Sequence, residues 1–385
     1  MDMPKESREQ RALAAVRGSN RVLPGAAGGE TIAERLARLV ESAPRAYDLN
    51  DFTDAGGGGV VAELERRTAS LLGMEEAAFF PTGTMAQQIG LRCWAGRTGR
   101  NVVAAHPLAH LEVHERGAFA SVSGLRPVHP TKSPRNPTAE EVRGLDEPFG
   151  TLVLELPMRD AGFILPTWEE LSQVAEAARE RGAAVHFDGA RLWDCGPHFG
   201  RTLAELAGLA DSVYVSYYKS LDGISGAALA GPSSLIDEAR AWRHRYGGTL
   251  YQQWPAALAA LAGLDQELPR IPAYVAHAKT IASALREALT DRLPWARVYP
   301  EVPHTHQFQV WVPYSAEIAD EASLRLAEET KTLLFPFWAE PGPPGTAMAE
   351  MTVSSTALEW TPDDVDAAIA QFIEIAEALD AGSRA

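Results

Sequence analysis

Lys219 is a candidate for covalent chemistry because of its position in the sequence. It follows residues 212–218, where valines and tyrosines predict a β-strand. A lysine at the end of an apolar strand is poorly solvated, and desolvation lowers the pKa of its amine, which can then form a Schiff base with an aldehyde. The alternative is a strand-end lysine that reaches into solvent, as most lysines do.

Asp188 lies upstream of this lysine, in the segment 186–191, which reads HFDGAR. It follows a predicted buried strand, 183–187, so its carboxylate must be paired or it will be protonated. A pyridinium N–H would pair with it. A carboxylate in that position keeps a pyridine ring protonated, as an electron-sink cofactor requires.

A third group lies between a short apolar strand, 77–80, and the start of a helix, where residues 81–84 read PTGT. The first amides of a helix have no internal partner, and the helix dipole favours an anion. Gly83 permits close backbone approach, and the hydroxyls of Thr82 and Thr84 add donors, so this turn is a candidate phosphate site. A plain threonine N-cap is the alternative.

Together these three groups indicate one cofactor. Pyridoxal 5′-phosphate combines a phosphate, a basic ring nitrogen and an aldehyde, which the three groups would hold in turn. Thr82, Asp188 and Lys219 each follow a predicted strand. Ligands of open α/β sheets bind outside the carboxyl ends of the strands, so we expect the three residues at one edge of a sheet.

The elements that must position these groups alternate between strand and helix. This alternation predicts an α/β fold with a mostly parallel sheet flanked by helices. After residue 270 the pattern changes to that of a small α+β domain. The predicted strands are 77–80, 101–105, one within 121–128, 151–156, 183–187, 212–217, 307–312 and 348–353, and the predicted helices include 61–72, 168–181, 272–289, 320–334 and 362–380.

We therefore expect three parts: an N-terminal arm and helix at 1–50, a large cofactor-binding domain at 51–270 and a small C-terminal domain at 271–385. Residues 1 to about 30 are polar and glycine-rich, which is typical of a loosely packed extension. The glycine run 56–59 has no preceding strand and the wrong spacing for a dinucleotide-binding loop.

The overall charge restricts the partners. The 385 residues include 51 acidic and 35 basic side chains, for a net charge of −16. This balance argues against binding to nucleic acid or to an anionic membrane surface, whereas a small amino-acid ligand remains possible. The chain has two cysteines, no apolar leader at its start and no apolar run long enough to span a bilayer, so we expect a cytoplasmic protein.

A metal site is a weaker alternative. His106, His110, His114 and Glu115 have the four-residue spacing of ligands on a helix, but Pro107 and Gly117 make a long helix there doubtful. We therefore expect no bound metal.

The motifs resemble the threonine aldolase and β-eliminating lyase family, which has the aspartate-aminotransferase-like fold, fold type I of the pyridoxal-phosphate enzymes. The resemblance covers residues 64–263 and continues more weakly beyond them. It rests on residues 80–85 (FPTGTM), on His110 followed by Glu115 and Gly117, on 186–192 (HFDGARL) and on 216–221 (SYYKSL).

The resemblance implies a role for each matching residue. Lys219 would carry the cofactor and move protons, and Asp188 would pair with the ring nitrogen. Gly83, Thr84 and Ser216 would help to hold the cofactor. His110 would stack on the ring and act as the base on a substrate hydroxyl, and Arg191 would bind the substrate carboxylate.

The sequence departs from the family pattern at the carboxylate site. Residues 350–354 lack the arginine that the family has on a small-domain strand, so we expect Arg159 to replace that contact. The resemblance implies retro-aldol cleavage of β-hydroxy-α-amino acids to glycine and an aldehyde, by a homodimer or homotetramer. β-Elimination, transamination, carbon–carbon bond formation and an inactive cofactor-binding protein remain alternatives.

Overall fold

The computed structural model describes residues 7–25 and 29–384. By their contacts, residues 36–271 form one compact unit, and residues up to 35 together with 272–385 form another. Each unit is described by itself. The predicted division at residues 50 and 270 stays a prediction, and the part of the arm at 1–6 and 26–28 lies outside the described residues.

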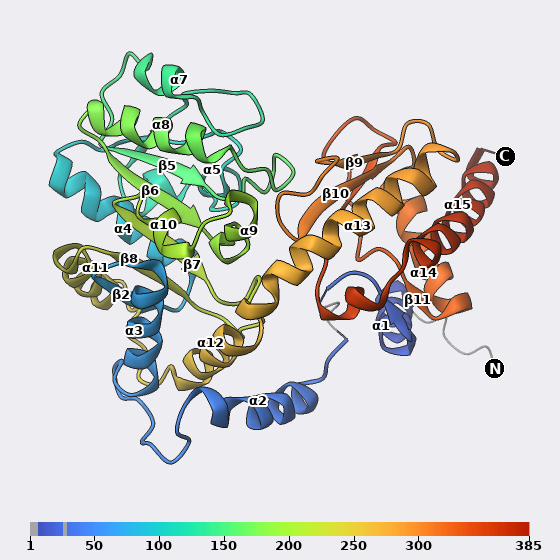
Figure 1. Cartoon of the computed structure of the whole chain (residues 1–385), viewed down its shortest axis with the longest axis horizontal. Coiled ribbons are helices and arrows are strands. Elements are labelled where there is room, and N and C mark those ends of the chain that lie inside the picture. The colour runs from blue at the N-terminus through green and yellow to red at the C-terminus, as the bar shows by residue number, and fades with distance from the viewer. Residues whose placement is uncertain (1–6, 26–28, 385) are drawn as a thin grey trace. The chain divides into compact units, whose positions relative to one another are not determined.

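The large unit, 36–271, is built on a seven-stranded sheet (Figure 1). Four of its neighbouring pairs are parallel, while β8 runs antiparallel to both of its neighbours. The mostly parallel α/β fold is therefore confirmed. The strands, in spatial order, are β2 (Glu76–Phe80), β8 (Ala227–Gly231), β7 (Ser212–Ser216), β6 (Ala184–Gly189), β5 (Thr151–Glu155), β3 (Val102–Ala104) and β4 (Arg126–Val128).

Helices cover both faces of this sheet. Helices α3, α8, α10 and α12 contribute to the larger core, and α4 and α11 pack over the opposite face. The helices are α2 (Ile32–Ala46, which begins in the other unit), α3 (Val60–Leu72), α4 (Gly83–Thr98), α5 (His110–Val113), α6 (Ala118–Ser121), α7 (Ala139–Arg143), α8 (Trp168–Glu180), η1 (Leu192–Asp194), α9 (Gly196–Phe199), α10 (Leu203–Ala207), α11 (Ser233–Arg245), α12 (Trp254–Gln266) and η2 (Leu268–Arg270).

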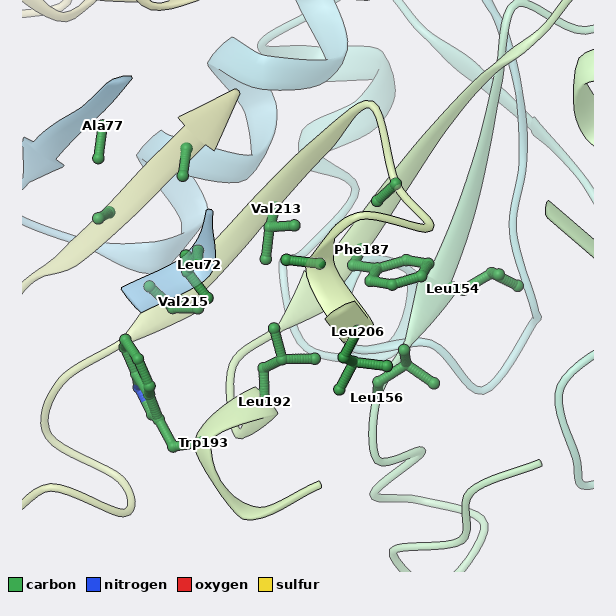
Figure 2. Packing of buried hydrophobic residues seen from close by; sticks show 14 of the residues in the cluster. Leu72, Ala77, Leu154, Leu156, Phe187, Leu192, Trp193, Leu206, Val213 and Val215 are labelled. Atoms are coloured by element: carbon green, nitrogen blue, oxygen red, sulfur yellow. The ribbon is translucent and has the colours of Figure 1, made fainter. Parts of the chain in front are cut away.

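Alternation along β7 divides its side chains between the two faces. Val213 and Val215 are fully buried in the larger core, where Figure 2 shows them with Phe187 of β6. Tyr214 belongs to the smaller core under α4. Because successive residues of a strand point to opposite faces, one strand serves the core on one side and the α4 side on the other.

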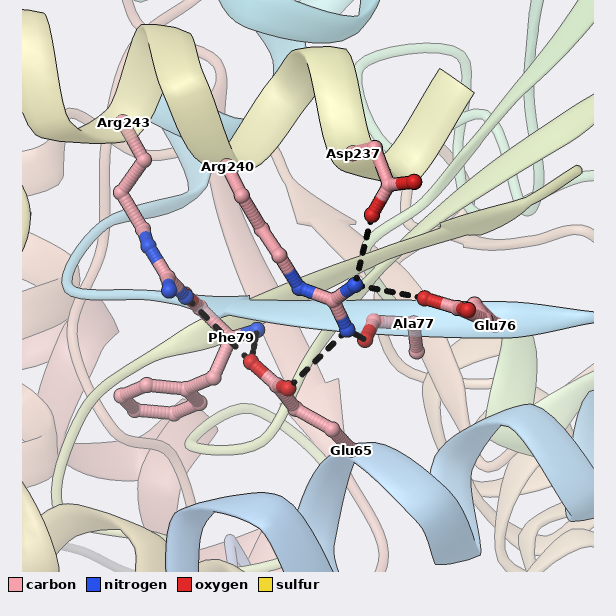
Figure 3. A network of polar contacts seen from close by, with 7 residues as sticks. All are labelled: Glu65, Glu76, Ala77, Phe79, Asp237, Arg240 and Arg243. Carbon is pink, nitrogen blue, oxygen red and sulfur yellow. Dashed lines mark hydrogen bonds and ion pairs between the residues drawn. The ribbon is translucent and has the colours of Figure 1, made fainter. Parts of the chain in front are cut away.

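An ionic network fixes the edge strand β2. The Glu65 carboxylate on α3 accepts a hydrogen bond from the Phe79 amide at 2.7 Å and contacts Arg240 and Arg243 of α11, each at 3.3 Å. Figure 3 shows Arg240 reaching Glu76 as well. Because β2 leads directly into the 81–84 turn, this network holds the strand that positions the candidate phosphate site.

The second unit contains a three-stranded antiparallel sheet and a parallel two-stranded pair. The expected helices and strands of the C-terminal region are present. The elements are β12 (Ala347–Thr352), β10 (Gln307–Val312), β9 (Arg297–Tyr299), β1 (Arg21–Val22), β11 (Thr332–Leu333), α1 (Arg8–Gly18), α13 (Ile271–Thr290), α14 (Ala316–Thr330), η3 (Ser355–Glu359) and α15 (Pro362–Arg384).

Two local predictions were wrong. Part of the predicted extension is helix α1, which starts with a capping box between Ser7 and Gln10. Helix α14 ends at Thr330 rather than 334, because Lys331 adopts a left-handed conformation with φ of 60°. The strand expected within 121–128 is present as Arg126–Val128, after a turn and loop at 122–125 that follow the end of α6.

Candidate active site

Lys219 follows β7 and is partly buried. Burial, followed by the positive charge of Arg191, lowers the pKa of the Lys219 amine to about 8. The amine lies 5.9 Å from the ring centre of Tyr218, an exposed neighbour. The neutral form that a nucleophilic lysine needs is therefore accessible near neutral pH.

Asp188 lies within β6, one strand away from β7. The prediction placed it just after the strand, which in fact continues to Gly189. One carboxylate oxygen accepts a 3.3 Å hydrogen bond from the Ala190 amide, and the other, Oδ2, is buried with no partner among the described residues. Burial raises the pKa of Asp188, and the positive charge of Lys219 opposes this rise. The unpartnered oxygen is the acceptor that a ring N–H would satisfy.

The turn at 81–84 combines a helix start with a close backbone approach. Thr82 is the N-cap of α4, and its hydroxyl accepts a hydrogen bond from the Met85 amide at 3.2 Å. This hydrogen bond occupies the Thr82 hydroxyl. The Thr84 side chain is exposed. A β-carbon on Gly83 would lie 2.8 Å from Cζ of Tyr214, so only glycine fits there without displacing the phenol.

Ser216 ends β7, three residues before Lys219. Its side chain is fully buried, and its hydroxyl has no hydrogen-bond partner in the described part of the chain. The Ser216 carbonyl accepts a hydrogen bond from the Trp193 indole at 2.8 Å. The free hydroxyl is consistent with the predicted cofactor contact.

His110 begins α5, and its side chain is about one third exposed. Its Nδ1 lies 3.6 Å from Oε1 of the buried Glu115 carboxylate, which also accepts a 2.8 Å hydrogen bond from Gln88. The His110 and His114 rings lie 5.1 Å apart, and His114 pairs with Asp160 at 2.9 Å. His110 thus has a carboxylate on one side and remains accessible to a ligand on the other.

The histidine cluster does not form a metal site in the described residues, where no group of three or more histidine, cysteine or acidic side chains is arranged to hold a metal. His106 is directed elsewhere: its Nε2 lies 2.7 Å from the Ser133 carbonyl, and its Nδ1 accepts a hydrogen bond from the Leu108 amide.

The two candidate carboxylate-binding arginines lie near the lysine. Arg191 and Arg159 both lower the pKa of Lys219 through their positive charge. The Arg191 guanidinium also lies 5.3 Å from the ring centre of Phe163. The structure therefore brings both arginines into the electrostatic environment of Lys219, within the same compact unit.

Glu155 was not predicted as a site residue. It ends β5, is 7% exposed and pairs in register with Asp188 on β6. Burial and the neighbouring Asp188 raise the pKa of Glu155 to about 7. A single acid at the end of an otherwise apolar strand was the signal in the sequence, because a buried carboxylate needs a reason to be there.

Comparison with known proteins identifies the family. The model of the beta-eliminating lyase family matches residues 38–300. The chain belongs to the beta-eliminating lyase family. A low-specificity L-threonine aldolase from Arabidopsis thaliana is 29% identical over 252 residues, which cover 61% of this chain and 68% of the relative.

Two solved structures extend the similarity over nearly the whole chain. A Listeria monocytogenes protein described as an L-allo-threonine aldolase has a TM-score of 0.84 and 30% identity, covering 95% of this chain and 99% of its own. An Exiguobacterium protein described as an aromatic amino acid beta-eliminating lyase/threonine aldolase has a TM-score of 0.84 and 32% identity, with the same coverage. This beta-eliminating lyase family member is a pyridoxal-phosphate-dependent lyase of the threonine-aldolase type and has fold type I, as predicted.

The residues present fit pyridoxal 5′-phosphate. The unpartnered oxygen of Asp188 and the unpartnered hydroxyl of Ser216 are buried acceptor and donor groups that a bound ligand would satisfy. The lowered pKa of Lys219 supplies an amine for the aldehyde, and the start of α4 supplies amides for a phosphate. The assignment of individual residues to these contacts stays a prediction.

Proposed function

We propose that this lyase cleaves the Cα–Cβ bond of β-hydroxy-α-amino acids to give glycine and an aldehyde. The observation that supports this most is the pairing of the accessible His110 imidazole with the buried Glu115 carboxylate. Retro-aldol cleavage needs a base for the β-hydroxyl in addition to the lysine, and an accessible imidazole beside a carboxylate suits that task. The names of the relatives support the same substrate class.

In this proposal, each residue has a separate task. The bound cofactor supplies an aldehyde that captures amino groups and a ring that delocalises the electron pair left at Cα. Lys219 holds the cofactor and returns a proton to Cα, while Asp188 keeps a proton on the ring nitrogen. Gly83, Thr84 and Ser216 hold the cofactor, and His110 takes the β-hydroxyl proton.

The substrate carboxylate is bound from within the large unit. The positive charges of Arg191 and Arg159 both act on Lys219, and a guanidinium can bind a carboxylate through two parallel hydrogen bonds. Their charge also favours the neutral Lys219 amine, so the same side chains serve binding and chemistry. This arrangement would replace the small-domain arginine that residues 350–354 lack.

β-Elimination is the second candidate. It is favoured by the description of the Exiguobacterium relative, which includes an aromatic amino acid beta-eliminating lyase. This reaction expels a group from Cβ and needs no base on a β-hydroxyl. The His110–Glu115 pair is therefore what separates the two proposals.

The test compares wild type with His110→Ala on threonine, phenylserine and tyrosine, in the presence of pyridoxal 5′-phosphate. We expect wild type to release glycine and an aldehyde from the first two, and His110→Ala to lower kcat by about 100-fold or more. A visible absorption band that persists in His110→Ala would show that the cofactor still binds. Pyruvate or ammonia from tyrosine, without aldehyde from threonine, would overturn the aldolase proposal in favour of β-elimination.

We further propose that the enzyme acts in the cytoplasm as a homodimer or homotetramer. Both cysteines are buried and free, which is typical of a reducing compartment. An apolar groove of about 340 Å³ is lined by residues from 36–60, Ile224 and 254–258. Its lining includes Phe52, which is 91% exposed, so this surface suits a second subunit. Sedimentation of wild type and of the Phe52→Asp variant tests the proposed oligomer. Trp295 is 79% exposed, and Trp295→Asp serves as the control.

A further inference from the structure

The Glu155 carboxylate joins two segments that approach the active site. Its Oε2 accepts a 2.8 Å hydrogen bond from the His110 amide, at the start of α5. Its Oε1 accepts a 3.1 Å hydrogen bond from the Arg159 amide, in the turn that follows β5. Each oxygen thus holds one backbone segment, and each segment carries a side chain proposed to face the substrate.

Few other side chains could hold both amides. Glutamine has one acceptor oxygen, so its amide nitrogen would face a backbone N–H as a second donor. Aspartate is one methylene shorter and does not span the same distance. A buried carboxyl group also accepts two amide hydrogen bonds most strongly when it is ionised. The site therefore depends on glutamate and on its ionised form.

Charged groups surround Glu155 on several elements. Asp188 is its register partner on β6, and it disfavours the ionised form by like charge. The backbone amides of His110 on α5 and of Arg159 favour ionisation through their hydrogen bonds to the carboxylate. Glu155 in turn acts on Lys219, where its negative charge raises the pKa.

We propose that Glu155 is a positioning residue that fixes the His110 and Arg159 segments relative to each other, so that the substrate's β-hydroxyl and carboxylate are bound in one geometry. This rests on the roles proposed above for His110 and Arg159. It adds a group that makes no contact with substrate and acts through two backbone segments. Misplacement of binding groups by about 1 Å can lower the rate about 100-fold. Loss of one of the two amide hydrogen bonds to Glu155 should therefore have a measurable effect.

The proposal carries a pH dependence with a definite sign. The pKa of Glu155 is raised to about 7, so above that pH the carboxylate is ionised and both amides are held. Below it, one oxygen carries a proton and is a much weaker acceptor for an amide N–H than a carboxylate oxygen. Amino-acid binding should therefore weaken as pH falls through about 7.

The experiment uses the full chain loaded with pyridoxal 5′-phosphate and compares Glu155→Gln with Glu112→Gln. Glu112 is the matched control, because it lies on α5 with His110 and burial raises its pKa too. The amides of His110 and Arg159 donate to Glu155 and not to Glu112. Binding of threonine is followed by the change in visible absorption of the bound cofactor from pH 6 to 9. This readout needs no turnover, so it remains informative if the proposed aldolase reaction fails.

We expect Glu155→Gln to retain the cofactor band, to bind threonine about tenfold more weakly at pH 8 and to lose the weakening below pH 7. Glu112→Gln should retain the wild-type pH dependence. Equal affinities and pH profiles for wild type and Glu155→Gln would overturn the proposal, as would a fall in thermal stability alone. If Glu155→Gln does not fold, Glu155→Asp takes its place. It should keep the pH step but bind threonine more weakly, and unchanged affinity would overturn the proposal.

Discussion

The phenol of Tyr214 lies directly against the α-carbon of Gly83, at the point where β7 faces the start of α4. A β-carbon at position 83 would approach Cζ to 2.8 Å. Gly83→Ala should therefore displace the tyrosine or the helix start, destabilise the fold by about 1–3 kcal/mol and weaken cofactor binding. Urea unfolding and titration with pyridoxal 5′-phosphate measure the two effects.

Gly96→Ala is the matched control for this prediction. Gly96 lies on the same helix, α4, and a β-carbon there meets no atom within 4 Å. Because alanine has a higher helix propensity, this variant should be stabilised by up to about 1 kcal/mol and bind the cofactor normally. If Gly83→Ala behaved like Gly96→Ala, the close approach to Tyr214 would have no consequence.

Asp188→Asn tests the ring-nitrogen assignment. An amide keeps the size of the side chain but cannot hold a proton on a pyridine nitrogen by charge, so kcat should fall roughly 100-fold or more while the cofactor still binds. The variant should also alter the Lys219 amine, because the Asp188 charge raises its pKa. Steady-state kinetics and the visible spectrum give the two readouts. A fully active Asp188→Asn would contradict the assignment.

The pKa of Lys219 predicts how fast the cofactor attaches. Burial and Arg191 lower this pKa from 10.5 to about 8, so the neutral amine is the main form above pH 8. The rate at which the visible band appears after mixing cofactor-free protein with pyridoxal 5′-phosphate should rise with pH, with a midpoint near 8, and level off above it. Removing a positive charge stabilises the ammonium, so Arg191→Ala should move this midpoint to higher pH. Lys219→Ala should show no such band.

The ionic network around Glu65 predicts how one substitution changes the free energy of unfolding. Glu65→Ala removes the partner of Arg243, whose side chain is only 8% exposed, and leaves the Phe79 amide unpaired. Loss of one partner of a buried pair typically costs about 3–5 kcal/mol. Urea unfolding should show a loss of this order. For comparison, Glu147→Ala removes the exposed partner of Arg126 and should cost about 1 kcal/mol or less.

The sequence was most informative where chemistry and local structure coincide. A lysine after an apolar strand, an acid before a glycine and a threonine-glycine turn before a helix were each readable from a few neighbouring residues. The structure places Asp188 on β6, Lys219 just after β7 and the turn just after β2, in one unit. Their exact contacts with the cofactor remain predictions.

The parts that were missed depend on long-range pairing. Strand β8 is composed of alanine, leucine and glycine, which have little intrinsic preference for strand, and only pairing with β2 and β7 makes it one. Glu155 looked like an isolated acid, because its two amide partners, at positions 110 and 159, come from different segments. Helix α1 had a readable capping box, which the polar composition obscured.

The alternation along β7 has a consequence for engineering this enzyme. Positions 213 and 215 belong to the larger core, whereas position 214 faces α4 and position 216 carries an unpartnered hydroxyl. A mutant library at position 216 would vary the surroundings of the cofactor without touching either core, whereas position 214 also packs in the smaller core and tolerates less change. A library at the odd positions would mostly select for solubility, with little change in the reaction catalysed.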